Sequence, residues 1–265
     1  MIPVVADADT LFGATTRGLL IHLDYQGLIR LHWSPLILDE LSRALVDTGR
    51  KPDAESARRH EQLMRDALPQ AEITTLEVQA QFARVAPAMR SAKDVHVAAC
   101  AAAILAGDFY PSTQVVSLVT KNIRDFGVRK LASQGIEVQR PDAFLLDRVQ
   151  QDPSAVASAF AALRATLRSA PGPARVLERL AAAGAGRLAT VPEDAIHVGG
   201  RHRLPGSQDH QPLDGVPQLA DVARPGTALQ AHDGLGVELP GRDHGRLGDP
   251  LREERHQFRD VGGPF

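Results

Sequence analysis

The sequence predicts an α/β fold with a mainly parallel central sheet. Two apolar runs, residues 2–6 and 115–119, lack the alternation of half-exposed strands and are typical of strands buried on both faces. Helical patterns lie between them, and strands that alternate with helices form parallel sheets. The 43% apolar and 23% charged content is ordinary for a globular protein, so a packed core is expected.

The first half of the chain offers clear start and stop signals. A helix is expected over residues 15–26, because three leucines share one face and Gly27 can end it. A short strand is expected over 28–32. Ser34 and Pro35 then begin a helix, since serine caps N-termini and proline suits the first turn. Residues 53–68 predict a charged amphipathic helix, 71–76 a strand and 77–84 a short helix.

Residues 92–106 form an alanine-rich stretch, which predicts a helix because alanine is the best helix former. The strand at 115–119 follows, and residues 136–139 are expected to form the last strand. Three further helices are expected over residues 142–150, 154–168 and 173–183. We therefore divide the chain into an α/β domain (1–145), a helical C-terminal extension (146–190) and a tail (191–265).

The tail differs in composition from the rest of the chain. It holds more than half of the 22 glycines and of the 10 histidines, and it has no lysine. Without an apolar run that could form a core element, we expect it to be disordered. Two origins fit this composition: a partner-binding tail, or GC-rich DNA translated out of frame after a shift near codon 190.

Four carboxylates lie where an apolar element meets a polar turn: Asp7, Glu40, Asp94 and Asp125. The carboxyl ends of parallel strands form sites, and both Asp7 and the loop 120–125 fall there. Acids that converge can hold a hard cation such as Mg²⁺, or Mn²⁺ in its place, through oxygen ligands. Such a cation offsets phosphate charge and activates water. The pattern indicates a metal-dependent nuclease, although each acid alone has an ordinary explanation as a cap or surface residue.

The segments around these acids, residues 5–11, 33–41, 93–99 and 119–126, resemble the four acidic motifs of PIN-domain ribonucleases. The toxin half of bacterial VapBC toxin–antitoxin pairs is the largest group with this pattern. The resemblance covers residues 1–145, and the helical stretch to about 190 is similar to an extension carried by one subgroup. It implies a PIN-like α/β/α sandwich, a Mg²⁺-dependent endoribonuclease, an RNA substrate, an antitoxin partner and a homodimer.

Carried over to this chain, the resemblance makes Asp7, Glu40, Asp94 and Asp125 the metal-site acids, with Thr120 and Asn122 supporting them by hydrogen bonds. Asp9 either adds a fifth acid or caps the next helix. His96 is interpreted as a structural, packed or hydrogen-bonded residue. The basic residues nearest the motifs are the candidates for phosphate contact: Arg17, Arg43, Lys93, Lys121 and Arg124.

Other readings of the chain stay open at this point. The Asp7-Ala-Asp9 pair suggests a phosphatase of the haloacid dehalogenase type, but Leu11 and the lack of a later acidic pair depart from that pattern. A catalytically inactive PIN-like binding module is the other alternative. The net charge of −2 gives no whole-chain basic signature, and Cys100, the only cysteine, suits a reducing cytoplasm. No signal peptide or membrane span is expected.

Overall fold

The computed structural model describes residues 1–107, 109–167 and 171–186, and the tail expected at 191–265 lies outside them. At its centre is a four-stranded sheet in the order β2-β1-β3-β4, and every pairing is parallel. The strands are β1 (Ile2–Ala6), β2 (Ile29–His32), β3 (Val116–Val119) and β4 (Ile136–Gln139). The predicted α/β class and parallel sheet are confirmed.

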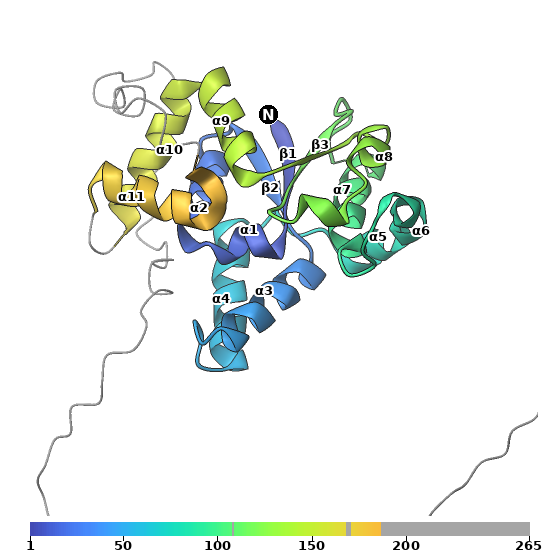
Figure 1. Cartoon of the computed structure of the whole chain (residues 1–265), viewed down its shortest axis with the longest axis horizontal. Coiled ribbons are helices and arrows are strands. Elements are labelled where there is room, and N and C mark those ends of the chain that lie inside the picture. The colour runs from blue at the N-terminus through green and yellow to red at the C-terminus, as the bar shows by residue number, and fades with distance from the viewer. Residues whose placement is uncertain (108, 168–170, 187–265) are drawn as a thin grey trace, which may run out of the picture. The chain divides into compact units, whose positions relative to one another are not determined.

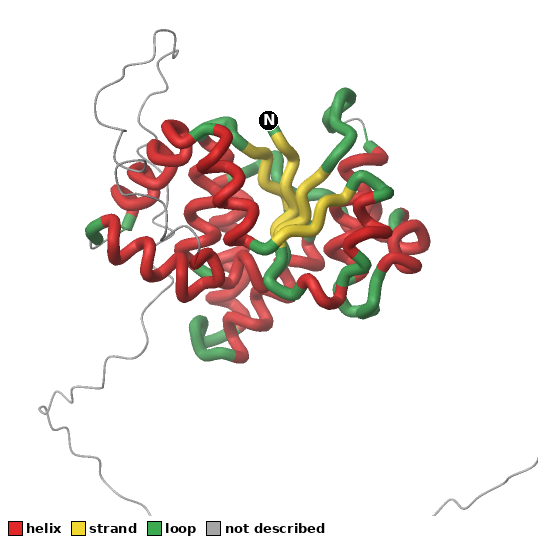
Figure 2. Tube along the Cα trace, turned by 45° about the horizontal axis from the view of Figure 1, so that its top comes forward, coloured by secondary structure: helices red, strands yellow, loops and turns green. Residues whose placement is uncertain are grey.

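Helices cover both faces of the sheet, which lies between them in Figures 1 and 2. On one face, α7 packs against β1, β3 and β4, and α5 and α6 pack on α7. On the other side, α2 packs against β2, and the C-terminal helices α10 and α11 pack on α2. The helices before β3 are α1 (Ala8–Phe12), α2 (Ala14–Tyr25), α3 (Pro35–Asp47), α4 (Ala54–Ala67), α5 (Thr75–Ala80), α6 (Phe82–Val85), η1 (Ala86–Ala88) and α7 (Val95–Ala106). Those after β3 are η2 (Ile123–Asp125), α8 (Val128–Ala132), α9 (Pro141–Gln151), α10 (Pro153–Thr166), α11 (Pro173–Leu180) and the π-helical turn η3 (Ala181–Ala185).

Local signals in the sequence account for most of these boundaries. The Ser34 side chain accepts a hydrogen bond from the Ile37 amide at 3.4 Å, and Pro35 is the first residue of α3. Gly27, with φ of 71°, ends the α2 segment in the left-handed conformation that glycine adopts at low cost. All four residues of β3 are buried, as an apolar run without alternation predicts.

Two expected elements differ in the structure. Residues 71–76 form no strand; they contribute a single parallel bridge between Trp33 and Glu72. A capping box explains the difference, since Thr74 and Glu77 bond each other's backbone amides and begin α5 at Thr75. The alanine-rich helix begins at Val95 instead of residue 92, which places Asp94 at its N-cap.

The three helices expected after residue 141 are all present, each beginning with a proline at its first position. The domain boundary drawn at residue 145 falls inside α9. Contact between α10 and α2 is close, because a β carbon built at Gly18 would lie 2.7 Å from Cδ1 of Leu163. None of the described helices has both the length and the apolar character that crossing a bilayer requires.

Candidate active site

The candidate site lies at the carboxyl ends of β1 and β3, the two central strands. The chain passes from β1 to β2 at one edge, crosses to β3, and continues to β4 at the other edge. The strand order therefore reverses between β1 and β3, the usual ligand site of such sheets. Asp7 follows β1 directly, and Thr120 follows β3. The Asp7 amide donates to the Val119 carbonyl at 3.0 Å, and the Thr120 hydroxyl donates to the Asp7 carboxylate at 2.8 Å.

Asp7 is a buried acid, 5% exposed, at the N-cap of α1. Burial raises the pKa of its carboxyl from 3.8 to about 7, and the negative charges of Asp9 and Glu40 raise it as well. Hydrogen bonds from Thr120 and from the Ala8 amide act in the opposite direction without cancelling the shift. A carboxyl group with its pKa raised in this way is destabilised when it is ionised, and a bound cation would offset that destabilisation.

Asp9 lies beside Asp7 and bonds the loop after β3. Its carboxylate accepts hydrogen bonds from the Lys121 amide at 3.0 and 3.2 Å and from the Thr120 hydroxyl at 3.4 Å. It does not cap the next helix, since the N-cap of α2 is Gly13 and no side chain caps it. Asp9 is therefore a further carboxylate beside Asp7, and its role as a fifth acid at a metal site stays a prediction.

A second pair of acids forms where α7 meets the loop after β3. Burial raises the pKa of Asp94, and a hydrogen bond with Asp125 and the charge of Asp125 raise it further. The Asn122 side-chain amide donates to the Asp125 carboxylate. The Asp125 carbonyl accepts from the Arg90 amide at 2.8 Å, and this bond holds the segment before α7 against the loop.

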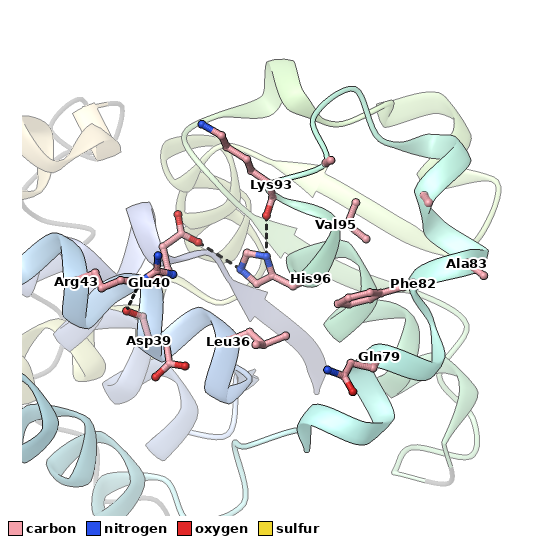
Figure 3. Close-up of a pocket in the computed structure, with 12 residues that line it drawn as sticks. Leu36, Asp39, Glu40, Arg43, Gln79, Phe82, Ala83, Lys93, Val95 and His96 are labelled. Atoms are coloured by element: carbon pink, nitrogen blue, oxygen red, sulfur yellow. Dashed lines mark hydrogen bonds and ion pairs between the residues drawn. The ribbon is translucent and has the colours of Figure 1, made fainter. Parts of the chain in front are cut away.

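Glu40 on α3 faces His96 on α7, as Figure 3 shows. Nε2 of His96 lies 3.3 Å from the Glu40 carboxylate, poorly aligned for a hydrogen bond, so the contact is mainly electrostatic. Nδ1 of His96 lies 2.8 Å from the Lys93 carbonyl and can donate to it. A proton on both ring nitrogens satisfies both oxygen neighbours. Burial opposes this state, but Glu40, the Lys93 carbonyl and the charge of Asp7 together raise the pKa of His96, while the contact with His96 lowers the pKa of Glu40.

The acids form two pairs linked by one further charge. Asp7 lies with Asp9, Asp94 lies with Asp125, and the charge of Glu40 raises the pKa of both Asp7 and Asp94. In the part of the chain that the structure describes, no three His, Cys, Asp or Glu side chains are grouped closely enough to hold one ion. Mg²⁺ needs only one or two protein carboxylates and keeps several waters. The oxygen donors of either pair therefore fit this ion.

An open groove of about 910 Å³ runs beside Glu40 (Figure 3). Leu36, Phe82 and Val95 give it an apolar floor, and Arg43 and Lys93 add positive charge. The groove therefore places two of the predicted phosphate-contact residues next to one of the predicted acids.

The other basic candidates differ in their access to the site. Lys121 is partly buried beside Asp9, and Arg124 is exposed on η2. Arg17 is only 2% exposed, and its guanidinium donates to the Leu11 carbonyl at 2.5 Å. Burial, together with the charge of Arg50, lowers the pKa of Arg17 to about 10. The expectation that Arg17 contacts substrate is corrected here, because its guanidinium is committed to the protein interior.

Arg50, which the sequence did not single out, lies near this side of the site. Its guanidinium donates to the Phe12 carbonyl at 3.0 Å and stacks 3.9 Å from the centre of the Phe12 ring. Its charge also lowers the pKa of Lys121. No local signal marks Arg50, because Phe12, the residue that it contacts, lies more than 30 positions away in the sequence.

A family model described as the VapC50 C-terminal domain matches residues 141–191. Its matched range begins with α9 and takes in α10, α11 and η3. Comparison with curated proteins gives no match, and comparison with solved structures gives none either. The extension is thus similar to one attached to VapC toxins, which suggests a protein of the VapC family.

Proposed function

We propose that this chain is a Mg²⁺-dependent endoribonuclease and the toxin component of a type II toxin–antitoxin pair. The observation that carries the proposal is the electrostatic coupling of acids from four separate segments at the carboxyl ends of β1 and β3. The match of the C-terminal extension to the VapC50 domain supports the toxin family. Mn²⁺ is expected to replace Mg²⁺, because both take carboxylate and water oxygens.

The chain's own residues would divide the work. Asp7, Asp94 and Asp125, with Glu40 beside them, would supply oxygen ligands directly or through water. Bound Mg²⁺ would neutralise phosphate charge and lower the pKa of a water molecule that attacks phosphorus. Thr120 fixes the orientation of the Asp7 carboxylate, and the Asn122 side chain does the same for Asp125.

The groove and the basic side chains around it support an RNA substrate and an antitoxin partner. Arg43 and Lys93 in the groove, with Lys121 and Arg124, would contact RNA phosphates without reading sequence. The groove combines an apolar floor with basic side chains, which suits an antitoxin segment that blocks the site. We also propose a homodimer, by resemblance to other toxins of this group.

The competing functions are not favoured by the geometry. In a phosphatase of the haloacid dehalogenase type, the second acid of the pair must be free to act on substrate. Here the Asp9 carboxylate takes the Lys121 amide and the Thr120 hydroxyl. An inactive binding module would have no reason to keep the four charges close to one another.

The test is cleavage of RNA with Mg²⁺ or Mn²⁺ by the wild type and by Asp94→Asn. Asp47→Asn is the matched control, because Asp47 is an exposed acid on the same helix as Glu40. We expect Asp94→Asn to lose at least about 100-fold in rate, as loss of a charge that stabilises the transition state does. Equal rates for Asp94→Asn and wild type, or cleavage that survives EDTA, would refute the mechanism.

A further inference from the structure

The Lys121 side chain leaves the site loop and lies against the C-terminal extension. Its amide is fixed by Asp9, and its carbon stem lies over Gly184 in η3. A β carbon built at Gly184 would lie 3.4 Å from Cε of Lys121 and 3.6 and 3.7 Å from the two carbons before it. A β carbon there would be in ordinary van der Waals contact with the stem, so the Lys121 side chain passes next to the turn. The extension thus reaches a residue directly after β3.

Close contacts between glycines and side chains of other elements accompany this position of η3. Gly184 has φ of 95°, which favours glycine, and a β carbon built at Gly13 would lie 3.0 Å from Cβ of Ala183. Farther along α2, Gly18 admits Leu163 of α10. Gly13 and Gly18 therefore let the extension pack along α2, so that η3 lies near the acidic site.

The charge around Lys121 is balanced between an acid and a base. Burial lowers its pKa, the charge of Asp9 raises it, and the charge of Arg50 lowers it. Among the described residues, no hydrogen bond from the Lys121 ammonium group is seen, whereas Arg50 is held by Phe12. Lys121 thus lies beside Asp9, and its ammonium group keeps its donors for a ligand.

We infer that Lys121 forms a phosphate-contact subsite for the RNA strand, and that Gly184 of the extension positions Lys121 in it. This inference rests on the proposed nuclease function. A lysine stem confined between the loop after β3 and η3 loses less freedom on binding than an exposed one, which favours a directed phosphate contact. The extension then belongs to the substrate site, although its sequence carries none of the catalytic acids.

Binding of a short single-stranded RNA, measured by fluorescence anisotropy at several KCl concentrations, tests the subsite. Ca²⁺ replaces Mg²⁺ in this assay, so that the readout does not require cleavage. Lys121→Met keeps a stem of similar size against Gly184 but removes the charge. We expect it to weaken binding about fivefold and to reduce the slope of log affinity against log salt by about 0.7, the value for one phosphate contact on a single strand. An unchanged slope would overturn the subsite.

The role of the extension is tested by Gly184→Val, with Gly186→Val as the matched control. A side chain at Gly184 is strained by its φ, and the branches of valine extend beyond a β carbon that already contacts the Lys121 stem. A β carbon at Gly186 meets no atom of the described residues within 4 Å. We expect Gly184→Val to lower the salt slope as Lys121→Met does, and the double variant to show no further loss. Equal losses for Gly186→Val, or full additivity in the double variant, would refute the positioning role.

The two proposals fail in different ways. Cleavage by the wild type together with an unchanged slope for Lys121→Met would refute the subsite and leave the nuclease function standing. No cleavage with Mg²⁺ or Mn²⁺, together with a lower slope for Lys121→Met, would refute the nuclease function and retain a phosphate-binding site. Thermal unfolding of each variant separates a local change from loss of the fold.

Discussion

Replacing Asp7 with Asn should stabilise the metal-free protein, and the gain should depend on pH. The Asp7 carboxyl is buried beside Asp9 and within reach of the charge of Glu40, and its pKa rises from 3.8 to about 7. Asparagine has nearly the same shape but carries no charge. It can accept from the Ala8 amide through its oxygen, as the carboxylate does, and its amide group can donate to Thr120.

The size of the stabilisation expected for Asp7→Asn follows from the pKa shift of Asp7. Because the folded pKa lies above the unfolded one, the folded state binds more protons between pH 4 and 7, and wild-type stability falls as pH rises through this window. A shift of about three units corresponds to about 4 kcal/mol at pH 8. This is an upper value, since Asp9 and Glu40 share the repulsion and relax when Asp7 is neutral. At pH 4 the difference between the two proteins should nearly vanish.

Urea unfolding in EDTA at pH 4, 6 and 8 measures this directly. Adding Mg²⁺ at pH 8 should raise the stability of the wild type more than that of Asp7→Asn, because the ion offsets the charge that the variant has already lost. Asp47→Asn, a change at an exposed acid, controls for net charge. If the Asp7→Asn gain is the same at pH 4 and pH 8, the carboxylate is not strained and the reasoning fails.

Three further changes have defined outcomes. Thr120→Val removes the hydrogen bond that lowers the pKa of Asp7, so metal-free stability should fall by about 1 kcal/mol and its pH-dependent window should move upward; urea unfolding against pH would show no movement if the bond were absent. Gly127→Ala places a β carbon 2.3 Å from the Ala88 carbonyl oxygen, and thermal unfolding should show a loss of about 1–3 kcal/mol, whereas an unchanged midpoint would contradict this contact. Arg17→Met should leave the KM for RNA unchanged because Arg17 is buried; a severalfold rise in KM would restore it as a substrate contact.

Local patterns predicted the sheet and the edge at which Asp7 lies. Apolar runs without alternation marked β1 and β3, and the polar residues that follow them necessarily lie at one end of a parallel sheet. That argument placed Asp7 and the loop after β3 at the same edge, and in the structure Thr120 of this loop bonds the Asp7 carboxylate. The strand expected at 71–76 failed because the Thr74 and Glu77 capping signal was stronger than the β pattern.

Contacts between distant segments were not predictable in the same way. Arg17 lies on the buried face of α2, and its only carbonyl partner among the described residues belongs to α1, a five-residue helix that the sequence pattern did not reveal. A charged residue near a motif was therefore read as a surface contact. Arg50 was missed for the converse reason, since only the packing of α3 against α1 brings its loop to Phe12.

The extension packs against the rest of the protein at glycines, and these contacts are visible only in the folded structure. Gly18 lies inside α2 and Gly13 is its extended N-cap residue, and nothing nearby in sequence explains why a larger residue is absent at either position. In three dimensions each is the point where the extension touches α2, and Gly184 is the point where it touches Lys121. A helical segment that is merely attached would need no such fits, because its contacts could adapt to side chains of any size. Contact between a glycine and a facing side chain at three positions argues that the extension and the acidic site form one structural unit, and that substitutions in η3 should alter substrate binding.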